Sequence, residues 1–180
     1  MINEKKILVT GGYGFIGSAL IRKLLNETNS LVFNLDKYGI VSDDKSIKEI
    51  LDKGKNLKER YKFYKVDLFD FELLENVFNN IKPDLVFHLA AESHVDRSID
   101  NPSQFINSNI IGTFNLLEII RKYLKNNIVD NFKLLHISTD EVFGSLPDNG
   151  KFNESTSYDP KSPYSASKAS SDHLVRAWRH

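Results

Sequence analysis

The chain has 180 residues, of which 41% are hydrophobic and 27% are charged, and 24 basic residues balance 24 acidic ones. A chain of this length and composition is typical of one globular domain with a buried core. The balanced charge offers no basic field for nucleic acid or for an anionic membrane surface. The sequence contains no cysteine, which excludes disulfides, thiolate catalysis and cysteine-bound zinc.

The sequence carries no recognisable membrane or export signal. No apolar run reaches the roughly 18–20 residues that span a bilayer. The first apolar run, residues 6–10, is too short for the core of a signal peptide, and no small-residue cleavage site follows it. We therefore expect a cytoplasmic protein, and the lack of cysteine agrees with a reducing compartment.

Apolar runs and amphipathic stretches alternate along the chain, which predicts strands alternating with helices. The expected strands are residues 6–10, 31–35, 61–66, 85–89 and 132–138, and the expected helices are 15–26, 47–59, 69–81, 102–124 and 163–180. The strands are continuously apolar, as in a parallel sheet that is buried on both faces. The fold class predicted is therefore α/β, a Rossmann-type doubly wound parallel sheet.

A glycine-rich turn directly follows the first strand. Gly12, Gly14 and Gly17 satisfy the pattern G-x-G-x-x-G, and Gly11, Gly14 and Gly17 satisfy a looser one. Either match alone is weak, but this one joins a strand to a helix, as a dinucleotide site requires. The glycines let the backbone approach a pyrophosphate, whose charge lies at the helix N-terminus. A glycine turn without a ligand is the alternative.

Acidic residues close the second and third strands. Asp36 can accept both hydroxyls of an adenosine ribose and repel a 2′-phosphate, which favours NAD over NADP. Lys37 weakens that preference, because its ammonium could offset the repulsion. Asp67 can reach the adenine edge, or it can serve only as a turn former.

Tyr164 and Lys168 stand four residues apart, on one face of the helix expected at 163–180. An ammonium beside a phenol should lower the pKa of the tyrosine and make it a usable base. Lys168 can also hold the ribose hydroxyls of a nicotinamide. The spacing alone is common, so the prediction depends on its position after the glycine turn and the fifth strand.

Two further polar segments follow strands four and five. Thr139, Asp140 and Glu141 come where ligands of an open α/β sheet bind, although a solvated acidic loop is an equal alternative. Ala90 and Ala91 are small enough for a cofactor to lie against their backbone. The residues after them lack metal-ligand spacing, so we predict no metal site.

Five stretches together resemble the extended short-chain dehydrogenase/reductase family, and most closely its nucleotide-sugar 4,6-dehydratases. They are TGGYGFIG, HLAAESHVDRSI, NIIGT, ISTDEVFG and SPYSASKASSDHLVRAWR, and they cover most of the chain from residue 6 onward. The triplet Thr139-Asp140-Glu141 is the most specific, because related sugar epimerases usually carry other residues there.

The resemblance implies a cycle on dTDP-glucose in which NAD is regenerated. It implies that Tyr164 removes the proton of the sugar 4-hydroxyl, Glu141 takes the C5 proton and Asp140 protonates the departing 6-hydroxyl. Thr139 and Ser93 would contact the substrate. The residues implied to line the NAD site are Gly11, Gly14, Phe15, Ile16, Gly17, Asp36, Lys37, Asp67, Leu68, Leu89, Ala90, Ala91, Ser108, Tyr164 and Lys168. Alternatives are a UDP-glucose or other nucleotide-sugar dehydratase, an epimerase, and a non-catalytic NAD-binding fragment.

Members of this family are much longer than the chain, which stops inside its last expected helix. We therefore expect an incomplete Rossmann domain over residues 1–180 that lacks the C-terminal lobe for the nucleotide-sugar. The edge beside strand five should leave apolar surface uncovered. The resemblance also implies that the full-length protein is a homodimer, paired through the helices at 102–124 and 163–180.

Overall fold

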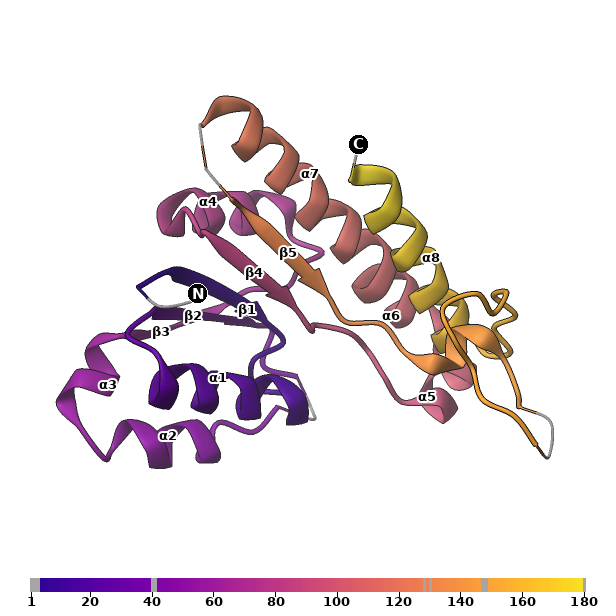
Figure 1. The fold of residues 1–180 in the computed structure, drawn as a ribbon, viewed down its shortest axis with the longest axis horizontal. Coiled ribbons are helices and arrows are strands. Elements are labelled where there is room, and N and C mark those ends of the chain that lie inside the picture. Colours follow the sequence, from indigo (N-terminus) through magenta and orange to yellow (C-terminus); the bar gives the residue numbers. More distant parts are fainter. Residues whose placement is uncertain (1–3, 40–41, 128, 130, 147–148, 180) are drawn as a thin grey trace.

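The described residues form a parallel sheet of five strands in the order β3-β2-β1-β4-β5 (Figure 1). The computed structural model describes residues 4–39, 42–127, 129, 131–146 and 149–179. The strands are β1 (Lys6–Thr10), β2 (Leu31–Asp36), β3 (Tyr61–Lys65), β4 (Leu85–His88) and β5 (Lys133–His136). The chain adds β2 and β3 on one side of β1 and then crosses to add β4 on the other. This reversal confirms the doubly wound α/β fold, and ligands of such sheets bind at the carboxyl ends of the strands beside it.

Helices cover both faces of the sheet. Helices α1 (Phe15–Glu27) and α2 (Lys45–Leu51) pack on one face, and α4 (Phe71–Ile81) and α7 (Gly112–Asn126) pack on the other. Successive side chains of β1 enter opposite faces, because side chains alternate along a strand. Thus Leu8 joins the core under α4 and α7, while its neighbours Ile7 and Val9 join the core under α1 and α2.

Two of the expected helices are interrupted. The helix expected at 47–59 is two helices, α2 and α3 (Lys55–Glu59), because the chain turns at Gly54 between them. The helix expected at 102–124 comprises α6 (Pro102–Phe105), a π-helical segment (Ile106–Ile111) and α7. The sequence-based prediction of one regular helix in each place was wrong.

A short helix, α5 (Val95–Asp100), was not predicted. The last described helix, α8 (Pro163–Trp178), begins with a capping box in which the Ser162 and Ser165 side chains bond each other's backbone. Its expected end, His180, lies outside the described residues. In Figure 1, α8 runs beside α7 at the β5 edge of the sheet.

The edge strand β5 leaves apolar surface exposed, as expected, with Leu135 48% exposed. No helix in the described part of the chain is both long and apolar enough to cross a bilayer.

Candidate active site

The glycine turn lies at the carboxyl end of β1, between the ends of β2 and β4. Gly11 has a φ of +71°, and a Cβ there would lie 2.7 Å from the Cα of Ala90. A Cβ on Gly17 would lie 2.2 Å from the carbonyl oxygen of Gly11. Both positions therefore require glycine, because any side chain would push α1 or the loop after β4 away from the turn.

The N-terminus of α1 is open next to this turn. Gly14 precedes the helix, and no side chain among the described residues caps it. Phe15 is 94% exposed and Ile16 is 60% exposed, although both are large and apolar. Free backbone N–H groups suit a pyrophosphate, and the two apolar side chains are available to cover a bound ligand. The turn therefore fits a dinucleotide.

Asp36 lies beside the turn, as expected, and its carboxylate is already held by three donors. Its Oδ2 accepts from the N–H of Tyr13 at 3.0 Å, and its Oδ1 accepts from the N–H of Tyr38 at 2.8 Å and the hydroxyl of Ser42 at 3.0 Å. A carboxylate oxygen can accept two hydrogen bonds, so Oδ2 keeps the capacity to bind a ribose hydroxyl.

Other predicted site residues lie on the segments that follow β3 and β4: Asp67, Leu68 and Ser108 were implied for NAD, and Ser93 for the substrate. Asp67 is exposed and its Oδ1 accepts from the N–H of Phe69 at 3.0 Å, so it does form the turn that was the alternative. Leu68 is buried in the core beside Gly112. Ser93 is exposed directly before α5, and Ser108 lies in the π-helical segment.

A chain of buried hydrogen bonds runs beneath the loop that follows β4. The Ala90 N–H donates to Thr10 Oγ1 at 3.2 Å, Thr10 Oγ1 lies 2.7 Å from His88 Nδ1, and His88 Nε2 lies 3.0 Å from Thr113 Oγ1. Thr113 donates to the carbonyl of Asn109 at 2.6 Å, so its oxygen must accept from His88 Nε2–H. His88 then carries its proton on Nε2 and accepts from Thr10. Burial, with the nearby His136 and Lys168, keeps the pKa of His88 well below its usual value, so the ring is neutral.

Asn109 joins the loop after β4 to α8. Its side-chain oxygen accepts from the N–H of Glu92 at 2.8 Å, and its side-chain nitrogen donates to the Glu92 carbonyl at 2.9 Å and to Ser167 Oγ at 2.8 Å. Ser167 donates in turn to the carbonyl of Tyr164 at 2.7 Å. Sequence reasoning missed Asn109, and no local signal distinguishes it from the neighbouring polar residues Asn107 and Ser108.

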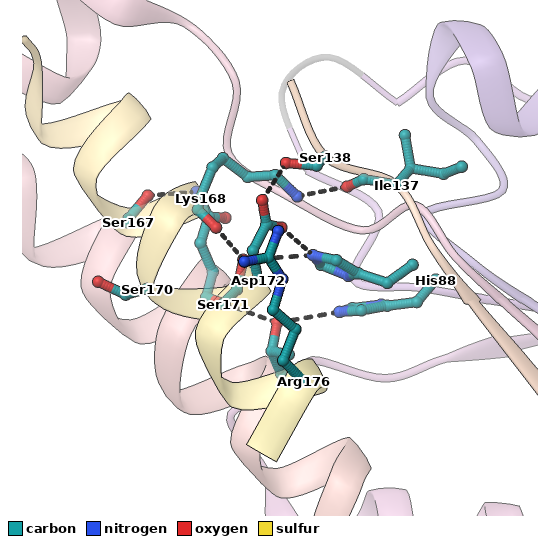
Figure 2. Close-up of polar contacts among 12 residues, drawn as sticks. His88, Ile137, Ser138, Ser167, Lys168, Ser170, Ser171, Asp172 and Arg176 are labelled. Atoms are coloured by element: carbon teal, nitrogen blue, oxygen red, sulfur yellow. Dashed lines mark hydrogen bonds and ion pairs between the residues drawn. The ribbon is translucent and has the colours of Figure 1, made fainter. Parts of the chain in front are cut away.

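Tyr164 and Lys168 are both buried on α8, with 8% and 5% of their surfaces exposed. The Lys168 ammonium donates to the carbonyl of Ile137 at 2.6 Å, as Figure 2 shows. Burial lowers the pKa of Lys168 to about 8.

Tyr164 does not have the lowered pKa that the sequence predicted. Burial raises its pKa, an interaction with Thr139 lowers it, and the carboxylates of Glu141 and Asp140 raise it further. The expectation was wrong because the Lys168 ammonium donates to the carbonyl of Ile137, the residue after β5, and not to the phenol of Tyr164.

The acidic triplet lies beyond the carboxyl end of β5, near Tyr164. Thr139 Oγ1 accepts from the N–H of Glu141 at 3.3 Å and begins a 3₁₀ turn, Asp140–Phe143. Asp140 and Glu141 are exposed. The 3₁₀ turn contacts α8, and Thr139, Asp140 and Glu141 all affect the pKa of Tyr164, so the structure brings these four predicted residues together.

A polar cluster around the buried Asp172, which the sequence did not predict, anchors α8 behind Lys168 (Figure 2). Asp172 accepts from His136 Nε2 at 3.0 Å, Ser138 Oγ at 2.5 Å and the Tyr158 hydroxyl at 2.9 Å. Burial alone would raise the pKa of Asp172, but these hydrogen bonds outweigh it and lower the pKa. The cluster fixes Ser138, the residue before the acidic triplet, against the turn of α8 that follows Lys168.

No group of three or more histidine and carboxylate side chains in the described ranges is arranged to hold a metal ion. The chemistry available at the carboxyl edge of the sheet is therefore that of an open helix N-terminus, a buried tyrosine and lysine, a hydroxyl and two carboxylates.

Comparison with known proteins identifies the family. A family model described as GDP-mannose 4,6 dehydratase matches residues 8–180. The chain belongs to this family, within the extended short-chain dehydrogenases/reductases. It is 51% identical to a dTDP-glucose 4,6-dehydratase of Escherichia coli, an alignment that covers 97% of this chain and 50% of the relative. The chain thus spans about half the length of the curated relatives it matches.

Solved structures agree with this assignment. A dTDP-glucose 4,6-dehydratase of Streptomyces venezuelae with NAD bound superposes with a TM-score of 0.83 at 37% identity, over 96% of this chain and 51% of the other. A UDP-Glc/GlcNAc 4-epimerase of Campylobacter jejuni superposes with a TM-score of 0.81 at 28% identity, over 96% and 48% of the two chains. The fold is therefore shared by dehydratases and epimerases, and the reaction must be argued from the site.

Proposed function

We propose that this chain is the NAD-binding and catalytic portion of a dTDP-glucose 4,6-dehydratase, a lyase. The observation that carries the proposal is the placement of Thr139, Asp140 and Glu141 beside Tyr164, at the same edge of the sheet as the glycine turn. An elimination from a sugar needs a base for one proton and an acid for the leaving hydroxyl, and two adjacent carboxylates suit these opposite tasks. The identity to dTDP-glucose 4,6-dehydratases supports the choice of substrate.

The residues present fit NAD. The open N-terminus of α1 would bind the pyrophosphate and Asp36 the adenosine ribose, while Lys168 would hold the nicotinamide ribose. The expected contacts of Asp67, Leu68, Ser108 and the segment 89–91 are part of the same proposal. Bound NAD would supply a hydride acceptor at sugar C4 and a donor at C6, so that the cofactor is not consumed.

The side chains then divide the proton transfers. Tyr164 removes the proton of the 4-hydroxyl, and Thr139 donates a hydrogen bond to the same oxygen. Glu141 removes the C5 proton, which the neighbouring 4-keto group acidifies, and Asp140 protonates the departing 6-hydroxyl. Ser93, exposed before α5, contacts the sugar. Lys168, whose ammonium donates to the Ile137 carbonyl, holds the nicotinamide ribose beside these groups.

The test uses the longest polypeptide that the gene encodes. With dTDP-glucose it should form the 4-keto-6-deoxy sugar without net accumulation of NADH, as measured by mass spectrometry and absorbance. Net NADH accumulation would contradict the proposal. Conversion of UDP-glucose in preference to dTDP-glucose would support a dehydratase but overturn the choice of nucleotide.

Epimerisation is the second candidate, because an epimerase shares the fold. Glu141→Gln separates the two reactions. In a dehydratase it should abolish exchange of the C5 proton with solvent, whereas C4 epimerisation should continue largely unchanged. A third outcome, NAD binding without any turnover by the longest polypeptide, would identify a non-catalytic dinucleotide-binding module.

We also propose that the full-length protein is a cytoplasmic homodimer. Large apolar side chains are exposed on the π-helical segment and the first turn of α7, where Ile106 is 42%, Ile111 36% and Phe114 38% exposed. Exposed apolar groups that cluster on neighbouring turns favour an interface. Sedimentation of the full-length protein should give a dimer, and replacement of Phe114 by Glu should give a monomer.

A further inference from the structure

We propose that Glu92 makes the site select NAD over NADP by neutralising Lys37. The inference rests on the proposed dinucleotide site and adds a residue that determines its specificity. Asp36 alone disfavours a 2′-phosphate, but a cation at the next position could reverse that effect. In the structure, this cation is paired with a carboxylate.

Lys37 directly follows β2, at the position where the 2′-phosphate of NADP would meet the chain. Its ammonium forms an ion pair with the carboxylate of Glu92, in the loop after β4. Because β1 lies between β2 and β4 in the sheet, the pair crosses the carboxyl end of β1, above the glycine turn.

Asn109 holds the backbone of Glu92 in place. Asn109 bonds both the N–H and the carbonyl of Glu92, at 2.8 and 2.9 Å, and Asn109 is itself 1% exposed. The Glu92 side chain is 17% exposed, whereas the longer and more flexible Lys37 side chain is 37% exposed. The fixed carboxylate therefore determines where the ammonium lies.

The charges around the adenosine ribose follow from this arrangement. Asp36, held by three donors, contributes a negative charge next to Lys37. With Glu92 present the three side chains sum to one negative charge, which repels a phosphate. With a neutral side chain in place of Glu92 the sum is zero, and the Lys37 ammonium is free to bind the phosphate. The pair contributes little to folding because it is partly exposed, but it acts directly on a bound dianion.

The experiment measures the affinities of this 180-residue chain for NAD and NADP by isothermal titration calorimetry. Glu92→Gln should lower the ratio of NAD affinity to NADP affinity by roughly tenfold, because a charge near a phosphate at a protein surface has an effect of this order. The double variant Glu92→Gln/Lys37→Met should restore the wild-type ratio. Glu59→Gln is the matched control, since Glu59 forms an exposed ion pair on α3 at the opposite end of the sheet.

Two results in these variants would overturn the inference. They are an unchanged ratio in Glu92→Gln and a lowered ratio that persists in the double variant. If Glu92→Gln does not fold, Lys37→Met keeps the test decisive: it leaves Asp36 and Glu92 with two negative charges, so it should raise the ratio of NAD affinity to NADP affinity, and an unchanged or lowered ratio would overturn the inference. Failure of the wild-type chain to bind NAD at all would instead overturn the proposed function together with this inference.

Discussion

Lys168 is a buried ammonium, and its replacement by Met should stabilise the chain. Its ammonium donates a hydrogen bond to the carbonyl of Ile137, and burial lowers its pKa to about 8. A buried cation that lacks a close carboxylate partner costs folding free energy, which a site keeps only where the cation has a function. Lys168→Met therefore separates a catalytic role from a structural one.

The magnitude follows from the pKa. The shift from 10.5 to about 8 corresponds to roughly 3 kcal/mol of destabilisation at neutral pH. Loss of the hydrogen bond to the Ile137 carbonyl offsets about 1 kcal/mol of that. The free energy of unfolding of Lys168→Met should thus exceed that of the wild type by about 2 kcal/mol at pH 7.

The pH dependence of the free energy of unfolding gives the sign of this difference independently. Below pH 8 the lysine is protonated in both the folded and unfolded states, so the full cost is present. Between pH 8 and 10.5 the unfolded chain binds more protons than the folded one, so this residue's contribution to stability rises with pH. The advantage of the Met variant should therefore shrink from pH 7 to pH 10, and above the unfolded pKa only the cost of the lost hydrogen bond should remain.

Urea unfolding followed by circular dichroism at pH 7 and pH 9.5 measures both quantities. Lys53→Met, at an exposed position between α2 and α3, is the control and should show neither the gain nor its pH dependence. If Lys168→Met were less stable than the wild type at both pH values by the same amount, the reasoning from burial would be refuted.

Three further variants or measurements test separate parts of the site. Gly17→Ala places a Cβ 2.2 Å from the Gly11 carbonyl oxygen, so it should lower the free energy of unfolding by about 1–3 kcal/mol in urea titrations, and stability equal to the wild type would contradict the geometry. His88 should remain neutral and show no titration of its ring by NMR near pH 6.5, whereas a midpoint there would show that the ring is solvated. Asp172→Asn removes a buried anionic acceptor of three hydrogen bonds and should cost about 3 kcal/mol, against a negligible change for the exposed control Asp96→Asn.

The parts of the site that depend on local sequence could be predicted. The glycine turn, the carboxylate of Asp36 and the spacing of Tyr164 and Lys168 each reflect a rule that acts within a few residues. The doubly wound parallel sheet followed from the alternation of strands and helices, because right-handed crossovers leave few topologies for such a chain.

The parts that depend on distant contacts could not be predicted. In the π-helical segment, the Asn109 amide bonds Glu92 and Ser167, which are 17 and 58 residues away. Likewise, the bonds of Asp172 to His136 and Ser138 join α8 to a strand more than 30 residues earlier. The direction of the Lys168 ammonium, and with it the raised pKa of Tyr164, depends on the same packing.

The central claim is that this chain binds one nicotinamide dinucleotide at the glycine turn. Isothermal titration calorimetry of the wild-type chain and of Gly17→Ala with NAD tests it most directly. We expect one NAD bound per wild-type chain and no measurable binding by the variant, because the added Cβ clashes with the backbone of the turn and displaces the N-terminus of α1 that must bind the pyrophosphate. Absence of NAD binding by the folded wild-type chain, or equal binding by a folded Gly17→Ala chain, would contradict the account.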